Sequence, residues 1–457
     1  MSHPLLKSTA AAVIGLTGGA RILSSTTNAF VQSGAPVIEM RTVPDGSGES
    51  LLCMTSAVNT LAGIDLNIVA VTRSGLIHML VYLDDFLDSS NIPATTSAFN
   101  NVQAQFIIDN DGTVDTASYK YEVMLKRGWN HVVLSRAHRD APTRNGSATV
   151  GPTVGGVSGE AHINGGSASF SASMWDGNVS RVRVRIPGQG ATEKTRVFFK
   201  EIADGGLYNS FTCNIFDDGT EDTYTIVFPI MRSMGLRGTA AIISSLVGTP
   251  GYMTWDQIRE LRDAGWAIIN HTHTHQLAAT MAGYTVAQCR AEIAQCRDAI
   301  ITNGCAVNGS EHYFVAPFGG FLRQDAVNYR TALTLEGIYA SFGTTNQCTG
   351  GHLLDKQFIA RMEMNTYNDV TGYPITEMVR QYESSVRNGM SPMLMLHRAL
   401  NSISEPDGTP NNVQMLASEM RTLFERQMRL EEGEFTEVVN VTEAIPEMFT
   451  TDRMIAA

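Results

Sequence analysis

Residues 211–219 read Phe-Thr-Cys-Asn-Ile-Phe-Asp-Asp-Gly, an apolar run that ends in two carboxylates. Two further apolar runs lead into histidines in the same way: Trp266–Ile269 into His271 and His275, and Met393–Leu396 into His397. Short apolar runs of this kind are typical of buried strands. In a barrel of parallel strands, the carboxyl ends of all strands share one rim. The pattern therefore predicts a barrel that gathers acidic and imidazole side chains at one rim.

From about residue 205 the chain alternates predicted strands with predicted helices. Thr254–Gln257 and Thr285–Gln288 resemble capping boxes, and Gly265 and Gly304 are expected to end the two helices that follow them. Further strand candidates are Thr239–Ile243, Tyr313–Ala316, Gly337–Ser341, Phe358–Arg361 and Glu437–Val439. Seven or eight such units favour an α/β fold, a (β/α) barrel that is distorted or seven-stranded, over an open sheet.

The N-terminal half has a different pattern, in which short apolar runs alternate with Gly, Ser, Asn and Asp. Examples are Leu76–Leu83, Gln105–Ile108, Tyr119–Leu125 and His131–Leu134. Residues 181–186 alternate strictly between arginine and aliphatic side chains, so the two kinds should face opposite sides of a strand. This pattern favours an all-β sandwich of jelly-roll type.

The chain is thus expected to have three parts. Residues 1–35 would be a leader or attachment segment, because Lys7 precedes a stretch that is only mildly apolar and makes a poor secretory signal. Residues 36–204 would form the sandwich, and residues 205–457 the barrel.

The composition excludes several classes of protein. An apolar content of 43% and a charged content of 17% indicate an ordered globular chain, and 457 residues allow two or three domains. A net charge of −12 repels phosphate backbones, so nucleic acid is not an expected partner. The chain has no run of about 18 apolar residues, so we expect no membrane span. The cysteines lack Cys-x-x-Cys spacing, and Cys289 and Cys296 are expected to be buried thiols on a helix.

Residues 271–275 read His-Thr-His-Thr-His directly after a predicted strand. Zinc and similar divalent ions bind imidazole nitrogen and carboxylate oxygen readily. One helical turn here would put His271 and His275 on one face and leave His273 pointing elsewhere. The alternative is a polar loop whose histidines bond to the backbone.

The pair Asp217–Asp218 adds carboxylates to these imidazoles. Adjacent carboxylates repel each other unless a cation or a proton separates their roles. One can bind a metal ion while the other accepts a proton from the attacking water. The alternative is a solvated turn, because Asp84–Asp85 is a similar pair in the N-terminal half.

These residues resemble the motifs of the polysaccharide deacetylases, the NodB-homology group of carbohydrate esterase family 4. Asn214–Gly219 compares with the family's Thr-Phe-Asp-Asp-Gly motif, and residues 271–275 fit its His-Ser/Thr-x-x-His motif. Ala316–Gly319 compares with a looser apolar-Pro-aromatic-Gly motif, and Met395–His397 with Leu-x-His. The resemblance covers about residues 207–445.

The resemblance implies a role for each matched residue. Asp218, His271 and His275 would bind one divalent metal ion, most often zinc in this family. Asp217 would be the general base, and His397 the acid that protonates the leaving amine or alcohol. The backbone N–H of Phe318 would help to stabilise the oxyanion, while Pro317 and Gly319 would shape the groove wall.

The chain departs from the family at two points. The third motif often begins with an arginine that pairs with the base, whereas this chain has Ala316. We hypothesise that Arg361 supplies the missing cation to Asp217; the alternative is that Arg361 pairs with Glu363 or faces solvent. The family's acidic fourth motif is not recognisable, and Asp325 and Asp355 are the nearest candidates.

In the N-terminal half, Gly128–Val133 resembles a strand of the concanavalin- or laminin-G-like jelly rolls, which often bind glycans. Trp129 and Trp175 would then stack on sugars; the alternative is that both are core residues. A glycan-binding module beside the barrel would raise the local concentration of a polymer at its rim.

We therefore expect a metal-dependent hydrolase that removes N- or O-linked acetyl groups from a surface or extracellular polysaccharide. One alternative is a glycan-binding or structural tail protein without activity, and another is a metal-dependent amidase on a non-sugar amide. The Gly- and Ser-rich β half without a clear secretion signal suggests a secreted or virion-associated protein, such as a trimeric phage tail spike or fibre component.

Overall fold

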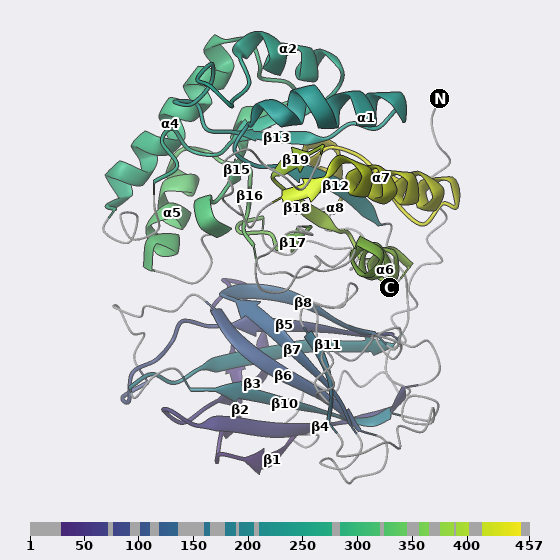
Figure 1. The fold of residues 1–457 in the computed structure, drawn as a ribbon. Coiled ribbons are helices and arrows are strands. Elements are labelled where there is room, and N and C mark those ends of the chain that lie inside the picture. Colours follow the sequence, from purple (N-terminus) through teal and green to yellow (C-terminus); the bar gives the residue numbers. More distant parts are fainter. Residues whose placement is uncertain are drawn as a thin grey trace. The chain divides into compact units, whose positions relative to one another are not determined.

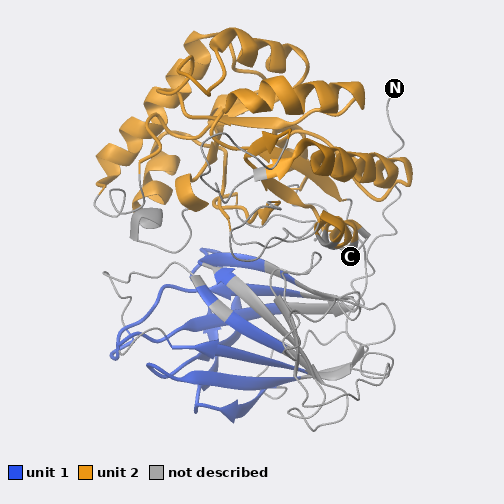
Figure 2. Ribbon diagram, viewed as in Figure 1, with its two compact units in different colours: residues 1–208, 451–457 blue, residues 209–450 orange. Residues whose placement is uncertain are grey.

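The computed structural model describes residues 29–71, 76–91, 101–109, 118–135, 160–164, 179–188, 192–204, 210–276, 284–319, 324–344, 356–364, 375–387, 390–401 and 414–448. The chain divides into two compact units, residues 1–208 with 451–457 and residues 209–450 (Figure 2). This division lies four residues beyond the boundary predicted between the sandwich and the barrel.

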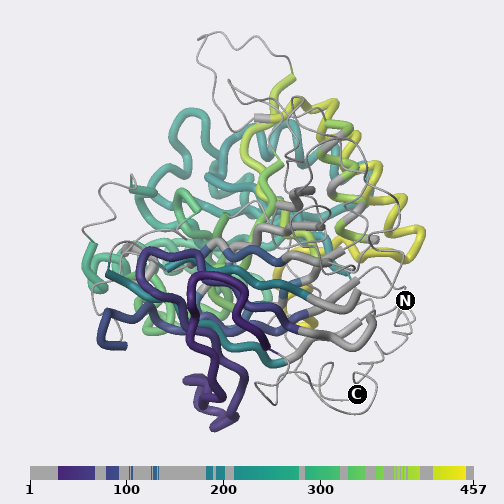
Figure 3. The backbone as a smooth tube through the Cα atoms, turned by 90° about the horizontal axis from the view of Figure 1, so that it is seen from below, coloured from purple at the N-terminus to yellow at the C-terminus, as the bar shows by residue number. Residues whose placement is uncertain are grey.

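Unit 1 consists of antiparallel strands in two sheets (Figure 1). The six-stranded sheet has the order β1-β4-β10-β6-β7-β9 and the five-stranded sheet the order β2-β3-β11-β5-β8. The strands are β1 (Ala29–Ser33), β2 (Val37–Thr42), β3 (Ser50–Thr55), β4 (Leu61–Val71), β5 (Leu76–Leu83), β6 (Asn101–Asp109), β7 (Ser118–Lys126), β8 (Gly128–Ser135), β9 (Glu160–Asn164), β10 (Val179–Pro187) and β11 (Arg196–Asp204). Strands β2 and β3 pair along their lengths in the purple part of Figure 3.

One predicted boundary in unit 1 is wrong. The leader predicted over residues 1–35 includes Ala29–Ser33, but this segment is strand β1, which pairs antiparallel with β4. Because its backbone joins the six-stranded sheet, these residues belong to the folded unit.

The larger hydrophobic core described in unit 1 contains residues from both sheets, among them Leu52 and Val81 from one and Ile64 and Phe106 from the other. Alternation along β10 explains its contribution: Val182, Val184 and Ile186 are buried in this core. Arg183, on the opposite face, makes an ion pair of 2.6 Å with Asp65. The predicted all-β character is therefore confirmed as antiparallel sheets, whereas the jelly-roll topology stays a prediction.

Trp129 is neither a core residue nor fully exposed. Its ring packs at the side of a small cluster around Phe198, and its Nε1 donates to Asp45 Oδ2 at 2.9 Å. Lys200 Nζ lies 5.7 Å from the ring centroid. Trp175 lies outside the described residues, so glycan binding by this unit stays a prediction.

Unit 2 has a parallel sheet with helices around it (Figure 1). Its strands are β12 (Phe211–Phe216), β13 (Thr239–Ile242), β14 (Ala267–Asn270), β15 (Tyr313–Val315), β16 (Ala340–Phe342), β17 (Met362–Glu363), β18 (Met393–Leu396), β19 (Arg398–Leu400), β20 (Gln414–Leu416) and β21 (Glu437–Val438). Its helices are the π-helix η5 (Thr223–Val227), α1 (Phe228–Ser233), α2 (Trp255–Asp263), α4 (Val286–Thr302), the 3₁₀ segments η6 (Ser310–His312) and η7 (Pro317–Gly319), α5 (Gln324–Leu335), α6 (Ile375–Arg387), α7 (Ala417–Glu432) and α8 (Val441–Met448).

The strand order of this sheet is β16-β15-β14-β13-β12-β18-β17, with β21 pairing beside β12. The two ends of the order meet through the segment before β17. Phe342 in β16 forms a parallel bridge with Ile359, and backbone bonds join Ile359 N to Ser341 O at 2.7 Å and Gly343 N to Ile359 O at 2.9 Å. The parallel strands therefore form the barrel-like fold that the sequence predicts.

In unit 2, the predictions that depend on only a few neighbouring residues of the sequence are confirmed. Capping boxes begin α2 at Thr254 and α4 at Thr285. Strands β12 and β18 have the predicted limits. Cys289 and Cys296 are fully buried on α4, as predicted.

Two predicted strands are displaced. Gly337 adopts a left-handed φ of 68° directly after α5, where Ile338 N donates to Leu333 O, so it ends a helix and β16 begins three residues later. Phe358 has a φ of 55°, which breaks the strand predicted over Phe358–Arg361 into the single bridge at Ile359 and the short β17. Within the described part of the chain, no helix has the length and apolar content that crossing a membrane requires.

Candidate active site

Three predicted metal ligands meet at the carboxyl ends of the barrel strands. Asp218 is the second residue after β12, and His271 and His275 follow β14. Asp218 Oδ1 lies 3.4 Å from His271 Nε2 and 3.7 Å from His275 Nε2. One ligand atom from each of the three residues lies within 4.8 Å of the others. A carboxylate oxygen and two imidazole nitrogens at these distances can hold one divalent ion.

The loop after β14 brings the histidines together without the helical turn that their spacing predicts. Residues 271–276 contain no helix, and Thr272 and His275 adopt left-handed φ values of 68° and 47°. The Asn270 side chain accepts a bond from Thr272 N at 2.9 Å, and Thr272 Oγ1 accepts one from His275 N at 3.0 Å. These bonds within the loop turn the chain back, so both Nε2 atoms face Asp218.

Two other ring nitrogens in this loop, His271 Nδ1 and His273 Nδ1, have partners of their own. His271 Nδ1 lies 2.9 Å from Val315 O and donates to it in the tautomer that leaves Nε2 free for a ligand. His273 points elsewhere, as predicted, and its Nδ1 lies 2.8 Å from Ser244 Oγ. His273 is therefore outside the ligand set.

Left-handed residues other than glycine gather at this rim. Besides the two loop residues, Asp218 has a φ of 72° and Phe318 a φ of 53°. Each such residue costs on the order of 1–3 kcal/mol and persists only where the surrounding structure holds it. Their clustering at one rim is typical of a functional site.

Asp217 is buried against Arg361. The guanidinium donates from Nη1 to Oδ1 at 2.7 Å and from Nη2 to Oδ2 at 2.9 Å. Arg361 also donates from Nε to Gly343 O at 3.1 Å, and it is only 1% exposed. The structure therefore places on Asp217 the cation that Ala316 cannot supply, and the predicted alternative, an Arg361 that faces solvent, does not occur.

Neighbouring groups lower the pKa of both aspartates. Burial would raise the pKa of Asp217, but Arg361, with His271 and His397 nearby, holds this pKa below its usual value. Burial would likewise raise the pKa of Asp218, but the hydrogen bond and charge of His271 hold it far below the usual range. Both carboxyls are thus ionised at neutral pH.

The histidines respond to the same groups. Burial would lower the pKa of His271, but its bond to Asp218 raises it above the usual value. Burial and the neighbouring His271 lower the pKa of His275 to about 4. Its imidazole is therefore uncharged at neutral pH and can offer a nitrogen lone pair to a metal ion. Asp218 therefore attracts positive charge to a place where two imidazole nitrogens converge, which fits a divalent cation.

His397 ends β18 beside the base. Its Nε2 lies 3.8 Å from Asp217 Oδ2, and its side chain is 13% exposed. Its Nδ1 is buried and has no hydrogen-bond partner among the described residues. Asp355 and the side chain of Asp325, the two candidates for the acidic fourth motif, lie outside the described residues.

The predicted groove wall forms the short η7 segment after β15. Pro317 is buried, whereas Phe318 is 54% exposed and its ring centroid lies 4.7 Å from that of His275. Gly319 has a φ of 78°, and a Cβ there would lie 3.0 Å from Thr344 Cβ. The backbone thus turns tightly and leaves the Phe318 side chain facing outward next to a ligand histidine.

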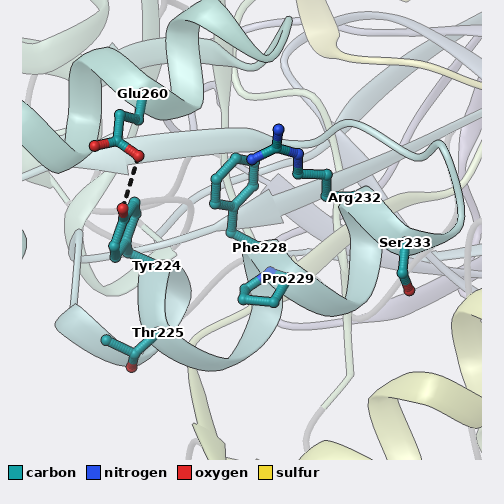
Figure 4. A pocket seen from close by; sticks show the side chains of 7 residues that line it. All are labelled: Tyr224, Thr225, Phe228, Pro229, Arg232, Ser233 and Glu260. Atoms are coloured by element: carbon teal, nitrogen blue, oxygen red, sulfur yellow. Dashed lines mark hydrogen bonds between the residues drawn. The ribbon is translucent and has the colours of Figure 1, made fainter.

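A surface groove elsewhere in unit 2 contains none of these residues. It has a volume of about 530 Å³ and is lined by Tyr224, Thr225, Phe228, Pro229, Arg232, Ser233 and Glu260. Figure 4 shows Tyr224 pointing to Glu260, to which its hydroxyl donates at 2.7 Å. The residues that line the groove belong to η5, α1 and α2, and none of them is a rim residue. The assignment of the active site therefore depends on the chemistry of the rim residues and not on this groove.

Two residues that hold the site were missed in the sequence. Asn270 is the last residue of β14, and Asp222 contacts the chain just after His397. The only sequence signal for Asp222 is its place as the fourth acid in the run Asp-Asp-Gly-Thr-Glu-Asp, which names no partner.

Comparisons with known proteins address the same segment. Residues 213–337 match the family model described as polysaccharide deacetylase. This range includes both aspartates, the histidine loop and η7. A putative polysaccharide deacetylase of Bacillus subtilis (strain 168), YxkH, is 32% identical over 60 residues, which are 13% of this chain and 22% of that protein. The chain thus spans about a fifth of the length of this curated relative.

Solved structures of low identity resemble the chain over about half its length. A family 4 carbohydrate esterase from Streptomyces lividans in complex with acetate is 17% identical, with 51% of this chain and 93% of that chain covered and a TM-score of 0.32. A family 4 acetyl xylan esterase from Clostridium thermocellum in complex with a cobalt ion is 17% identical, with 52% and 91% covered and a TM-score of 0.33.

The family match and the rim that carries its motif residues lead to one conclusion. The chain contains a polysaccharide deacetylase domain, matched over residues 213–337.

Proposed function

We propose that unit 2 is a metal-dependent hydrolase that removes acetyl groups from a polysaccharide. One observation carries the proposal: three ligand atoms within 4.8 Å of one another share a rim with an acid–base pair 3.8 Å apart. An ordinary surface turn would not hold these groups so close together, because like charges repel each other unless a cation lies between them.

Asp218, His271 and His275 would hold the ion, for which zinc suits the mixed oxygen and nitrogen ligands best. A divalent ion bound there would act as a Lewis acid toward the acetyl carbonyl oxygen. The bond from His271 Nδ1 to Val315 O orients this ring for the task.

Asp217 is proposed as the general base. Its carboxylate is ionised at neutral pH and would accept a proton from the water that attacks the acetyl carbon. Arg361 holds both of its oxygens, so the base cannot rotate away from the water. The same arginine makes the carboxylate a weaker base, but it also holds the carboxylate in a fixed position.

His397 is proposed as the general acid. Its Nε2 lies 3.8 Å from Asp217 Oδ2 and would donate a proton to the leaving nitrogen or oxygen. The backbone N–H of Phe318 is proposed to stabilise the oxyanion, and Pro317 and Gly319 to shape the wall beside it.

The test begins with metal content and acetate release. Purified protein should contain about one equivalent of zinc or a similar ion, release acetate from acetylated glycans, and lose this activity with a chelator. A panel of N- and O-acetylated polymers, including peptidoglycan and bacterial capsules, identifies the linkage.

A matched pair of variants makes the test specific. His271→Ala should lose both metal and activity, whereas His273→Ala, two residues away and bonded to Ser244, should keep both. A fully metal-loaded protein that releases no acetate from any polymer would favour a glycan-binding or structural role. Hydrolysis confined to non-sugar amides would favour the amidase alternative.

A further inference from the structure

We propose that Asp222 is a positioning residue that fixes the general acid His397 against the base Asp217. The inference rests on the proposed roles of those two residues, and it assigns the task that an acidic fourth motif has in related enzymes to a different carboxylate. The structural basis is a pair of attachments between residues 217–222 and residues 396–399.

The first attachment is the carboxylate of Asp222. It accepts a hydrogen bond from the backbone N–H of Ala399, two residues after His397. Its other oxygen lies 3.7 Å from Arg398 Nε. Asp222 is 9% exposed, so this contact is shielded from water.

Asp222 does not use its side chain for its own helix. It directly precedes η5 with helical backbone angles, a φ of −67° and a ψ of −23°, and its side chain makes no capping bond to the helix backbone. The carboxylate reaches across to β19 instead, which indicates that its role concerns the segment after His397.

The second attachment lies on the other side of His397. Asp217 N donates to Leu396 O at 2.8 Å, in register with the pairing of β12 and β18. His397 is therefore held between two bonds, and both start from the short segment that carries the base and the ligand Asp218.

This double attachment matters because, within the described ranges, no acceptor on Nδ1 orients the imidazole of His397. Catalytic histidines are usually held by an acceptor on the second ring nitrogen. Here Nδ1 has no hydrogen-bond partner among the residues that the structure describes. The position of the ring then depends on its backbone, and a displacement of about 1 Å at a reacting group can cost about 100-fold in rate.

The experiment compares two variants with a neighbouring control. Asp222→Ala removes the acceptor, Asp222→Asn keeps an oxygen that can accept from Ala399 N, and Glu221→Ala changes an exposed acid next door. Each is assayed on an acetylated sugar amide and on an aryl acetate, whose phenolate leaves without protonation. His397→Ala and Asp217→Asn provide the reference behaviour.

Asp222→Ala should lower kcat on the sugar amide about 10- to 100-fold, with KM and metal content unchanged. It should change little on the aryl acetate, as should His397→Ala, whereas Asp217→Asn should lose both activities. Asp222→Asn should restore most of the loss, and Glu221→Ala should behave as the unmodified protein.

Equal losses on both substrates, or a kcat that is unchanged in Asp222→Ala, would overturn the positioning role. A wild-type protein without acetate release would overturn the proposed function alone. In that case crystal structures of Asp222→Ala and wild type still decide, because the inference requires His397 to shift relative to Asp217 in the variant.

Discussion

Each unit contains an Asp–Asp pair directly after a strand, and the two pairs have different surroundings. In unit 1, Asp84 lies 3.4 Å from Arg196 and Asp85 lies 3.0 Å from Arg127, so each acid has its own guanidinium. In unit 2, Asp217 has Arg361, whereas Asp218 faces two imidazoles and, among the described residues, no guanidinium. The first pair is neutralised by the protein itself, whereas the second leaves one carboxylate to attract a cation.

The pKa shifts of the first acids differ in direction. Burial raises the pKa of Asp84 above its usual value, because the opposing effects of the Asp85 N–H and of Arg196 are smaller. The bidentate Arg361 overcomes the same effect at Asp217 and lowers its pKa. The dipeptide itself therefore predicts neither role, and the side chains that meet it decide.

The largest expected effect is the loss of activity in Asp217→Asn. The amide keeps the size of the side chain but cannot accept the proton, so kcat should fall about 1,000-fold while the metal stays bound. Asp84→Asn is the matched change in unit 1 and should keep full activity. Acetate release and metal analysis on both variants check the comparison, which fails if the two variants behave alike.

A smaller effect is expected for Arg361→Ala, which leaves Asp217 without the guanidinium that pairs with it. The rate at neutral pH should fall about 10- to 100-fold, because the base loses its fixed position. Burial then acts on Asp217 with less opposition, so its pKa rises. A base works only when deprotonated, so the acid side of the pH–rate profile should move to higher pH. An unchanged profile with full activity would exclude the role of Arg361.

Asp84→Ala should affect stability and not activity. Arg196 is 6% exposed and would keep only part of its bonding, to Thr55 Oγ1 at 3.2 Å. The unfolding free energy of unit 1 should fall by about 1–3 kcal/mol. Denaturant titration measures it, followed by tryptophan fluorescence in a background in which Trp255 and Trp266 of unit 2 are replaced by phenylalanine, with acetate release by Asp84→Ala alone as the control.

The smallest effect is expected for Asp85→Ala. Its side chain is 52% exposed, and pairs of this kind contribute about 0–1 kcal/mol. A loss larger than that of Asp84→Ala would show that burial does not rank the two acids in unit 1.

The sequence predicts this molecule best where short segments decide the structure. The two capping boxes and strand β12 depend on near neighbours or on one apolar run, and all three are observed. The prediction of a helical turn at residues 271–275 is wrong. The left-handed residues of this loop are held by the side chains of Asn270 and Thr272, which an argument from spacing ignores.

The site shows the same limit. The order of the motifs predicts that Asp218, His271 and His275 converge, because strand ends of a barrel share a rim. Contacts such as Asp222 with Ala399 join residues 177 positions apart and follow no local pattern. The pairing of Asp217 with Arg361 was a hypothesis among alternatives for the same reason, since 144 positions separate the two residues.

The closure of the barrel at Ile359 has a consequence for its fluctuations. At that residue a single bridge joins β16 to the segment before β17, together with backbone bonds from Ser341 N, Ile359 N and Gly343 N, whereas four residue pairs join β13 to β14. Local opening begins where such bonds are few, so amide hydrogens at this seam should exchange with solvent earlier than those of the central strands. Arg361 lies two residues beyond Ile359, and an opening at the seam would carry the guanidinium away from Asp217. The single-bridge closure of the barrel and the charge that holds the base thus belong to one segment.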